Sequence, residues 1–400
     1  MLLNLFIFLS AVFLLTFLLG RLIEKIRVPW IFAALLIGSG LAFYNPFKEI
    51  TSSAEFRFLA ELGMYFLLFI IGFEIDIKKL RRLSRFIFRS TFFIILFEAL
   101  FGTLIVHYIF HYPWFVSSVV ALSFATVGEA ILVPILEEFN VVNTKLGHSI
   151  IGIGTFDDLI EILTLILAMI LIGGKISTTN NFESNVLLIL IGLLFLFGFA
   201  FLLTKFKKEA RKFNFLRIES VFIFVLFILF LFLGVGKYAN SEAIAALLAG
   251  IALKTFLPKK RLKTIESEIK TLCYGFFAPI FFLWVGIEMD MRYLIAYPFL
   301  ILLVVAVSKG AKILASIVAG KKELGLKDSI LLGIGLSVRF STSIIIVKIL
   351  FEKGVIGSDI YSVIVGSSIA FKFIVPVLFA NLLARWHLKN FKKPRKSLIK

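Results

Sequence analysis

The sequence predicts an all-α polytopic membrane protein with about thirteen transmembrane helices. Two features of its composition lead to this fold class: 60% of the 400 residues are hydrophobic, with 48 phenylalanines, and only 17% are charged. A typical soluble domain is about 25% charged. Apolar segments that can cross a bilayer also recur along the whole chain, near residues 1–20, 30–44, 58–75, 90–110, 114–136, 149–173, 186–204, 219–236, 242–256, 272–288, 295–318, 329–350 and 360–384.

The first segment, 1–20, is expected to remain in the mature protein as its first span. It lacks the basic start and the small-residue cleavage site of a signal peptide. Segments 30–44 and 242–256 are short and interrupted by glycine, so we expect tilted or partly irregular helices there.

The formal charge of +18 is interpreted as a topology signal. Most lysines and arginines lie in the gaps after odd-numbered segments and in the tail from Arg385. The positive-inside rule therefore places the N-terminus outside and the C-terminus in the cytoplasm of a multi-pass protein of the cell membrane. Such basic gaps contact membrane lipids. Nucleic acid is not an expected partner, because no basic face outside the membrane carries interleaved aromatic residues.

The gaps between the segments are short, and none resembles a soluble regulatory domain. Two five-segment blocks, about 30–173 and 242–384, begin an odd number of segments apart and would cross the membrane in opposite directions. Inverted repeats of this kind are typical of transporters, so residues 1–400 are expected to form a single membrane transport domain. The chain has no Gly-rich phosphate loop, so no nucleotide is expected. The lone Cys273 excludes an internal disulfide.

Two adjacent carboxylates, Asp157 and Asp158, lie inside the apolar segment 149–173. At about 1.5 Å of rise per residue, they lie roughly 12 Å into a hydrocarbon core about 30 Å thick. An ionisable group at that depth costs about 2.5–3.5 kcal/mol. We expect a proton or a bound cation to visit the pair. Because neighbouring residues on a helix point about 100° apart, the two carboxylates should have different roles.

Lys309 is expected at a similar depth in segment 295–318, where it could pair with Asp157. Two interpretations remain: a permanent structural salt bridge, or a breakable pair whose lysine exchanges a proton. Lys312, one turn further on, is a rival partner. Glu161 is either a third ligand or a lining group of a cavity.

Three other ionisable residues within the segments carry separate expectations. Glu98 is an intramembrane acid to which the sequence assigns no partner. Lys348 is expected to extend its ammonium to the membrane interface, as long basic side chains near span ends commonly do. For Lys372, either a buried or an interfacial position is compatible with the sequence.

Two polar stretches predict broken helices at corresponding positions of the two blocks. One runs from Ser123 to Glu129 and is followed by a proline; the other runs from Gly333 to Ser343 and contains Ser337 and Arg339. Unwound backbone at membrane depth is tolerated where it is buried in protein or lines a cavity, and it helps to bind ions there. Glu129 and Arg339 would neutralise each other where the breaks cross. The serines could alternatively make ordinary interhelical hydrogen bonds.

These motifs together resemble the sodium/proton antiporters of the second monovalent cation–proton antiporter family, in the double-aspartate type with a Kef-like membrane domain. The resemblance covers nearly the whole chain, in order. It rests on Glu61-Leu62-Gly63, Gly72-Phe73-Glu74, Ala125-Thr126 through Pro134, Asn143 through Gly147, Gly154 through Asp158, Pro279 through Gly286, Lys309 and Arg339.

The resemblance implies a core domain of six helices, a dimerisation domain, a homodimer and an elevator-like movement. It makes Asp158 the carrier of Na⁺ and H⁺, Asp157 the residue that releases Lys309 when an ion binds, and Thr126 an oxygen ligand of the cation. Members with two aspartates and this lysine typically move more protons than sodium ions. Glu129 and Phe340 depart from the family pattern, which bears on selectivity and coupling.

The expected function is therefore antiport of Na⁺ (with Li⁺ or K⁺ as other candidates) against H⁺ by alternating access, which would serve pH homeostasis without a cofactor. A K⁺/H⁺ antiporter and a sodium-coupled symporter of the same architecture are the alternatives. An enzyme is not expected: an intramembrane aspartyl protease needs facing acids, and the remaining aspartates lie in the gaps. A channel would need a selectivity filter at a shared pore. Inverted repeats with a charge-paired centre fit alternating access better than they fit a channel.

Overall fold

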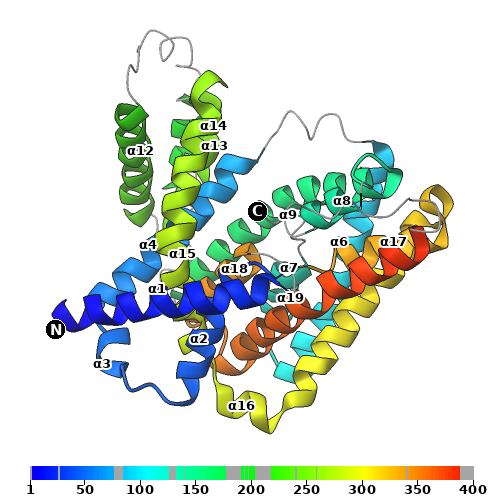
Figure 1. Ribbon diagram of the computed structural model, residues 1–400, viewed down its shortest axis with the longest axis horizontal. Helices are drawn as coiled ribbons and strands as arrows, with labels where there is room; N and C mark the ends of the chain where they lie inside the picture. Colours follow the sequence, from blue (N-terminus) through cyan, green and yellow to red (C-terminus); the bar gives the residue numbers. More distant parts are fainter. Residues whose placement is uncertain are drawn as a thin grey trace.

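The computed structural model describes residues 2–25, 28–75, 84–125, 132–139, 141–176, 191–192, 194–196, 198–202, 218–238, 241–257, 259–338 and 341–387. Helices form all the regular secondary structure of these residues, which confirms the predicted all-α class (Figure 1). The first half contains α1 (Leu2–Glu24), α2 (Phe32–Phe43), α3 (Lys48–Thr51), α4 (Ala54–Glu74), α6 (Arg85–Phe110), α7 (Trp114–Ala125), α8 (Val133–Glu138) and α9 (Lys145–Ile176). The second half contains α12 (Ile218–Tyr238), α13 (Glu242–Phe256), α14 (Lys259–Leu272), the π-helical turn η2 (Cys273–Phe277), α15 (Ala278–Ile287), α16 (Met291–Ala296), α17 (Pro298–Gly335), α18 (Ser341–Glu352) and α19 (Ser358–His387).

Seven of the described helices are long and apolar enough to cross a membrane, and α2 and α7 are shorter apolar helices. Described helices lie in every predicted segment, although residues 126–131 of segment 114–136, residues 339–340 of segment 329–350 and about half of segment 186–204 are outside the described part of the structure. The chain is thus a multi-pass membrane protein.

Helix α17 covers two predicted segments: residues 298–318 of the segment 295–318, and the start of the segment 329–350. It consists of two helical parts separated by a kink. Gly325 interrupts this helix with φ 79° and ψ 169°, a conformation that residues with a Cβ rarely adopt. The glycine therefore reverses the chain between two helical parts without a long loop. The predicted segment 272–288 is also longer than expected, because α14, η2 and α15 continue one another from Lys259 to Ile287.

Glycines set the contacts among α2, α4, α13 and α15, which pack together as one group. A Cβ on Gly38 of α2 would lie 2.3 Å from the Leu283 carbonyl oxygen, and one on Gly286 of α15 would lie 2.4 Å from the Leu35 oxygen. Between α4 and α13, Gly72 and Gly250 are equally restricted, at 2.0 Å and 2.1 Å from backbone oxygens. Small residues allow membrane helices to approach this closely. The resulting van der Waals packing stabilises the helix contacts in the membrane, where the hydrophobic effect does not drive helices together.

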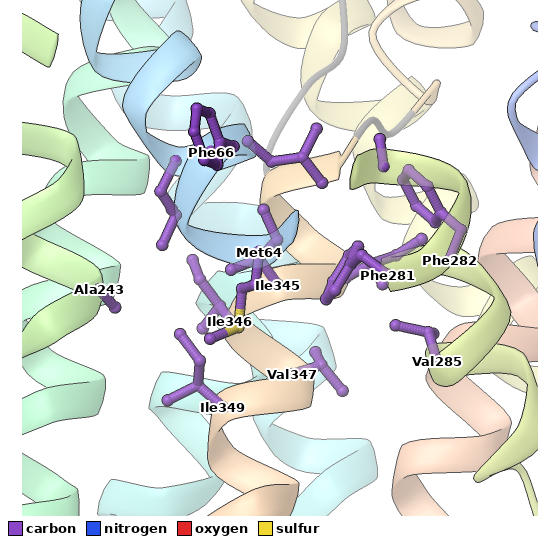
Figure 2. Close-up of a cluster of buried hydrophobic side chains, with 14 of the residues drawn as sticks. Met64, Phe66, Ala243, Phe281, Phe282, Val285, Ile345, Ile346, Val347 and Ile349 are labelled. Carbon is purple, nitrogen blue, oxygen red and sulfur yellow. The ribbon is translucent and has the colours of Figure 1, made fainter. Parts of the chain in front are cut away.

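A second group consists of α6, α7, α9, α17, α18 and α19, which contact one another. In Figure 1, α6 and α17 lie on one side of the molecule, and α12, α13 and α14 stand on the other. Helix α18 lies at the seam between the groups. Figure 2 shows its isoleucines Ile345, Ile346 and Ile349 facing Met64 of α4 and Phe281 of α15. This part of the seam is a layer of buried apolar side chains.

Charged residues hold the seam together at the Glu352 end of α18. Arg57 of α4 pairs with Glu352, and Lys348 of α18 pairs with Glu288 after the end of α15. We call these four residues the clasp. The Lys348 ammonium also lies 2.8 Å from a Glu352 oxygen and 3.6 Å from the centre of the Trp284 ring. The structure thus joins the two helix groups by ion pairs as well as by apolar contacts.

The expectation that Lys348 reaches the membrane interface is wrong. Its side chain is fully buried, because Glu288 and Glu352, the latter one turn further along the same helix, lie within its reach and replace water as its partners. Lys372 of α19 is also buried, 1% exposed, with its ammonium 3.4 Å from the centre of the Phe32 ring of α2. The buried alternative therefore holds for Lys372.

Candidate functional site

The two aspartates lie on α9, the central helix of the second group, which contacts α6, α7, α17 and α18. The Asp157 side chain is fully buried. The backbone of Asp158 belongs to the same helix, and its side chain is outside the described part of the structure. Glu161, one turn further along α9, is 6% exposed. Asp157 and Glu161 are therefore both buried inside the helix group, and the predicted depth of the acidic pair in the bilayer stays a prediction.

Two helices end close to one another beside α9. Helix α7 ends at Ala125 and α17 at Gly335, within the two stretches predicted to be broken. The Lys312 ammonium donates hydrogen bonds to the carbonyl oxygens of both ends, at 2.8 Å to Ala125 and 3.0 Å to Leu336. Helix C-termini carry a partial negative charge of about half an electron each. One buried ammonium thus binds the last described carbonyl oxygen of α7 and a carbonyl oxygen just after the end of α17.

Serine hydroxyls support the same crossing. Ser343 at the start of α18 donates to the Ser123 carbonyl oxygen of α7, at 2.7 Å. Ser337, 1% exposed, donates to the Gly333 oxygen one turn earlier in its own helix, at 2.7 Å. Ser343 therefore makes the interhelical bond that the sequence allowed, whereas Ser337 satisfies its hydroxyl locally. Ser337 follows two residues after the end of α17 and directly after Leu336, whose carbonyl oxygen accepts from Lys312.

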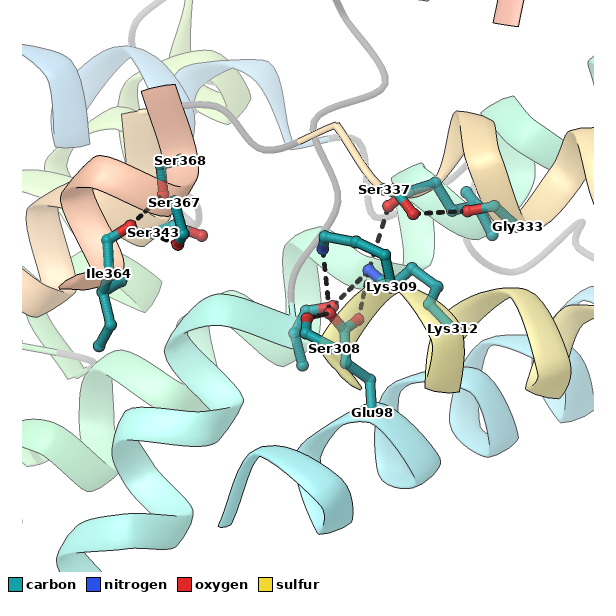
Figure 3. A network of polar contacts seen from close by, with 12 residues as sticks. Glu98, Ser308, Lys309, Lys312, Gly333, Ser337, Ser343, Ile364, Ser367 and Ser368 are labelled. Atoms are coloured by element: carbon teal, nitrogen blue, oxygen red, sulfur yellow. Dashed lines mark hydrogen bonds and ion pairs between the residues drawn. The ribbon is translucent and has the colours of Figure 1, made fainter. Parts of the chain in front are cut away.

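A buried carboxylate on α6, Glu98, contacts both lysines of α17 (Figure 3). Its Oε1 lies 3.0 Å from the Lys309 Nζ, and its Oε2 lies 2.7 Å from the Lys312 Nζ. The Ser308 hydroxyl donates to Oε1 as well. Glu98 is fully buried, and Lys309 is 7% exposed. A charged cluster of one carboxylate and two ammoniums therefore lies within the second helix group.

Lys309 also lies over the Phe371 ring of α19, 4.4 Å from its centre. Its ammonium thus has partners from two other helices of the group. The predicted ion pair between Lys309 and Asp157 stays a prediction. The structure adds Glu98, a partner that the sequence analysis did not assign to Lys309.

The sequence contained a signal for Glu98. Depth matching paired Lys309 with Asp157 because each lies about 8 or 9 residues from the cytoplasmic end of its predicted span. Glu98 lies at a comparable distance from the start of segment 90–110. The same argument applied to every intramembrane acid would have selected Glu98 too.

Three predicted site residues lie outside the described residues: Thr126, Glu129 and Arg339. The expected cation ligand Thr126 and the expected charge pair Glu129–Arg339 therefore stay predictions. Ala125, which precedes Thr126, accepts a hydrogen bond from Lys312 through its carbonyl oxygen. Val338, which precedes Arg339, lies two residues after Leu336, the second acceptor of Lys312.

Comparisons with known proteins agree with this architecture. The chain is 26% identical over 388 residues to the "Na(+)/H(+) antiporter" of Enterococcus hirae, covering 92% of this chain and 93% of the relative. It is 29% identical over 383 residues to the "Probable Na(+)/H(+) antiporter 3" of Methanocaldococcus jannaschii, covering 94% and 95%.

A solved structure has the same fold. The structure of the sodium proton antiporter MjNhaP1 from Methanocaldococcus jannaschii matches with a TM-score of 0.69 over 97% of this chain and 99% of that chain, at 21% identity. The family described as "Sodium/hydrogen exchanger, transmembrane" matches residues 11–385. The chain therefore belongs to the sodium/hydrogen exchanger family.

Proposed function

We propose that this protein is a secondary active antiporter that exchanges Na⁺ for H⁺ across the cell membrane. The observation that carries the proposal is the buried Asp157 on α9, a helix that contacts α7 and α17, where one Lys312 ammonium binds the Ala125 and Leu336 carbonyl oxygens. Family membership and two relatives named as Na⁺/H⁺ antiporters support the choice of ions.

The chemistry of the site supports competition between the two ions. Carboxylate and carbonyl oxygens are the ligands that hard cations prefer. A carboxylate of Asp158 that holds a proton has lost the charge that attracts Na⁺, so the two ions exclude each other. Thr126 would add an oxygen ligand at the end of α7. Mutual exclusion at one carboxylate is sufficient to couple an outward flow of one ion to an inward flow of the other.

Lys309 and Lys312 would offset part of the negative charge of Asp157, Asp158, Glu161 and Glu98. A bound Na⁺ or proton would reduce the remaining negative charge, and with it the large cost of a net charge in a membrane. In this proposal Asp157 pairs with Lys309 and releases it when the ion binds at Asp158.

The wider organisation is proposed on the same basis. Two inverted repeats, about 30–173 and 242–384, would form one transport domain that alternates its access between the membrane faces, with the N-terminus outside and the C-terminus in the cytoplasm. The predicted homodimer and the absence of a cofactor belong to this proposal. Glu129 and Arg339 would compensate each other's charge beside the two helix ends.

The test is a sodium-driven pH change in proteoliposomes that contain a pH-sensitive dye. Wild-type protein should move protons when a Na⁺ gradient is applied, and Asp158→Asn should not. Glu55→Gln, a change of an exposed acid at the start of α4, is the matched control and should behave as wild type. Full exchange by Asp158→Asn would contradict the site assignment.

The same vesicles separate the alternatives. A K⁺/H⁺ antiporter would respond to K⁺ and not to Na⁺, and a sodium-coupled symporter would need an organic substrate before Na⁺ moved. Imposing a membrane potential distinguishes electrogenic exchange from neutral exchange, because only unequal numbers of transported charges respond to it.

A further inference from the structure

Glu98 occupies the contact between α6 and α17, and each of its carboxylate oxygens has a different lysine partner. Oε1 lies 3.0 Å from Lys309 and also accepts the Ser308 hydroxyl, and Oε2 lies 2.7 Å from Lys312. Figure 3 shows the two lysine side chains and Ser308 converging on the carboxylate from α17. Full burial removes water as an alternative partner for this carboxylate.

The two lysines need a common counter-charge because they share one helix face. Residues three apart on a helix are neighbours, and like charges at that spacing repel. Repulsion is strongest in a buried site, where the dielectric constant is low. Glu98 lies between both ammoniums and therefore holds them at fixed positions, Lys312 at the two helix ends and Lys309 towards the Phe371 ring.

We propose that Glu98 is a positioning residue of the transport site: it fixes Lys312 at the helix ends and gives Lys309 a second carboxylate to hold when a cation binds on α9. This inference rests on the proposed function, since it concerns the release of Lys309. Without Glu98, a released Lys309 would have one carboxylate fewer to pair with in a buried position, which is costly. With Glu98, the release costs less, and the cation binds more tightly.

The negative charge of Glu98 also favours binding of the cation. Its removal adds one net positive charge on α6, a helix that contacts α9, and this charge opposes Na⁺ binding there. For any two unit charges about 10 Å apart, an effective dielectric constant near 20 corresponds to a change in affinity of roughly tenfold. A merely structural role for Glu98 would instead lower the amount of folded protein and the maximal rate, and would leave the Na⁺ affinity as it is.

The experiment measures KM for Na⁺ and the maximal rate in proteoliposomes with equal amounts of folded protein. Glu98→Gln should raise KM by about tenfold and change the maximal rate much less. Glu98→Asp keeps the charge but is too short to contact both lysines, so its KM should lie between those of wild type and Glu98→Gln. Glu288→Gln is the matched control, because it also removes a carboxylate paired with a buried lysine but lies in the clasp; its KM should stay at the wild-type value.

The results separate this inference from the proposed function. An unchanged KM in Glu98→Gln, with Asp158→Asn inactive in the same assay, would overturn the role of Glu98 alone. Exchange by Asp158→Asn would instead overturn the proposed function. If Glu98→Gln does not fold, Glu98→Asp decides: a KM raised about threefold or more supports the inference, and a wild-type KM overturns it.

Discussion

The Nζ of Lys312 lies 2.7 Å from the Oε2 of Glu98, and both side chains are completely buried. The same ammonium donates to the carbonyl oxygens of Ala125 and Leu336, at the ends of α7 and α17. One side chain therefore joins three helices, and its charge balances a carboxylate and two helix dipoles together. This arrangement places Lys312 at the structural centre of the site.

Replacing Lys312 by methionine should destabilise the protein strongly. The change leaves Glu98 with one lysine fewer and leaves two buried carbonyl groups without their donor. Breaking a buried ion pair from one side typically costs about 3–5 kcal/mol. Thermal unfolding in detergent should show a midpoint several degrees lower than wild type. Lys321→Met, at an exposed position of the same helix, is the control. Equal midpoints for the two variants would contradict the role given to Lys312.

The close contact of α2 with α15 predicts opposite effects for two glycines that lie two residues apart. Gly38→Ala places a methyl group 2.3 Å from the Leu283 oxygen and should destabilise the protein by about 1–3 kcal/mol. Gly40→Ala meets no atom within 4 Å and should be neutral, or stabilising by up to about 1 kcal/mol through helix propensity. Thermal unfolding of both variants checks the pair. A Gly38→Ala protein as stable as Gly40→Ala would show that the helices are not packed as described.

A covalent link across the clasp should stop exchange. Arg57 and Glu352 belong to different helix groups. In the proposed alternating access these groups move relative to each other. In a Cys273→Ala background, Arg57→Cys and Glu352→Cys would be joined by a bifunctional maleimide and assayed in proteoliposomes. The linked protein should lose most of its activity, and each single cysteine variant treated in the same way should keep it. Full activity of the linked protein would mean that this seam stays closed throughout transport.

Much of the fold could be predicted from the sequence, because a bilayer imposes a minimum length and an apolar composition on every span. The segments around α4, α6, α9 and α19 illustrate this agreement. The division of α17 agrees as well, because Gly325 lies in the gap between the predicted segments 295–318 and 329–350. The continuation of α14 into α15 was missed because the polar start of this helix reads as a loop.

The candidate site was predicted less completely, for a physical reason. Depth along a span follows from counting residues, and for Asp157 it stays a prediction, although the side chain is buried in the protein. Pairing depends on which faces of distant helices meet, and sequence periodicity in an all-apolar span contains little of that information. Glu98 therefore received no partner, and Lys348 was placed at the interface although Glu288 and Glu352 surround it. The Asp157–Lys309 pair stays a prediction.

The most direct test of the account is the pH dependence of Na⁺ affinity in proteoliposomes without a membrane potential. If Na⁺ and H⁺ compete for one carboxylate on α9, KM for Na⁺ should rise by up to about tenfold for each unit by which the pH falls, with the maximal rate at saturating Na⁺ unchanged. A KM that stays constant while the maximal rate falls with pH would show that the proton acts elsewhere and would contradict competition at a shared site.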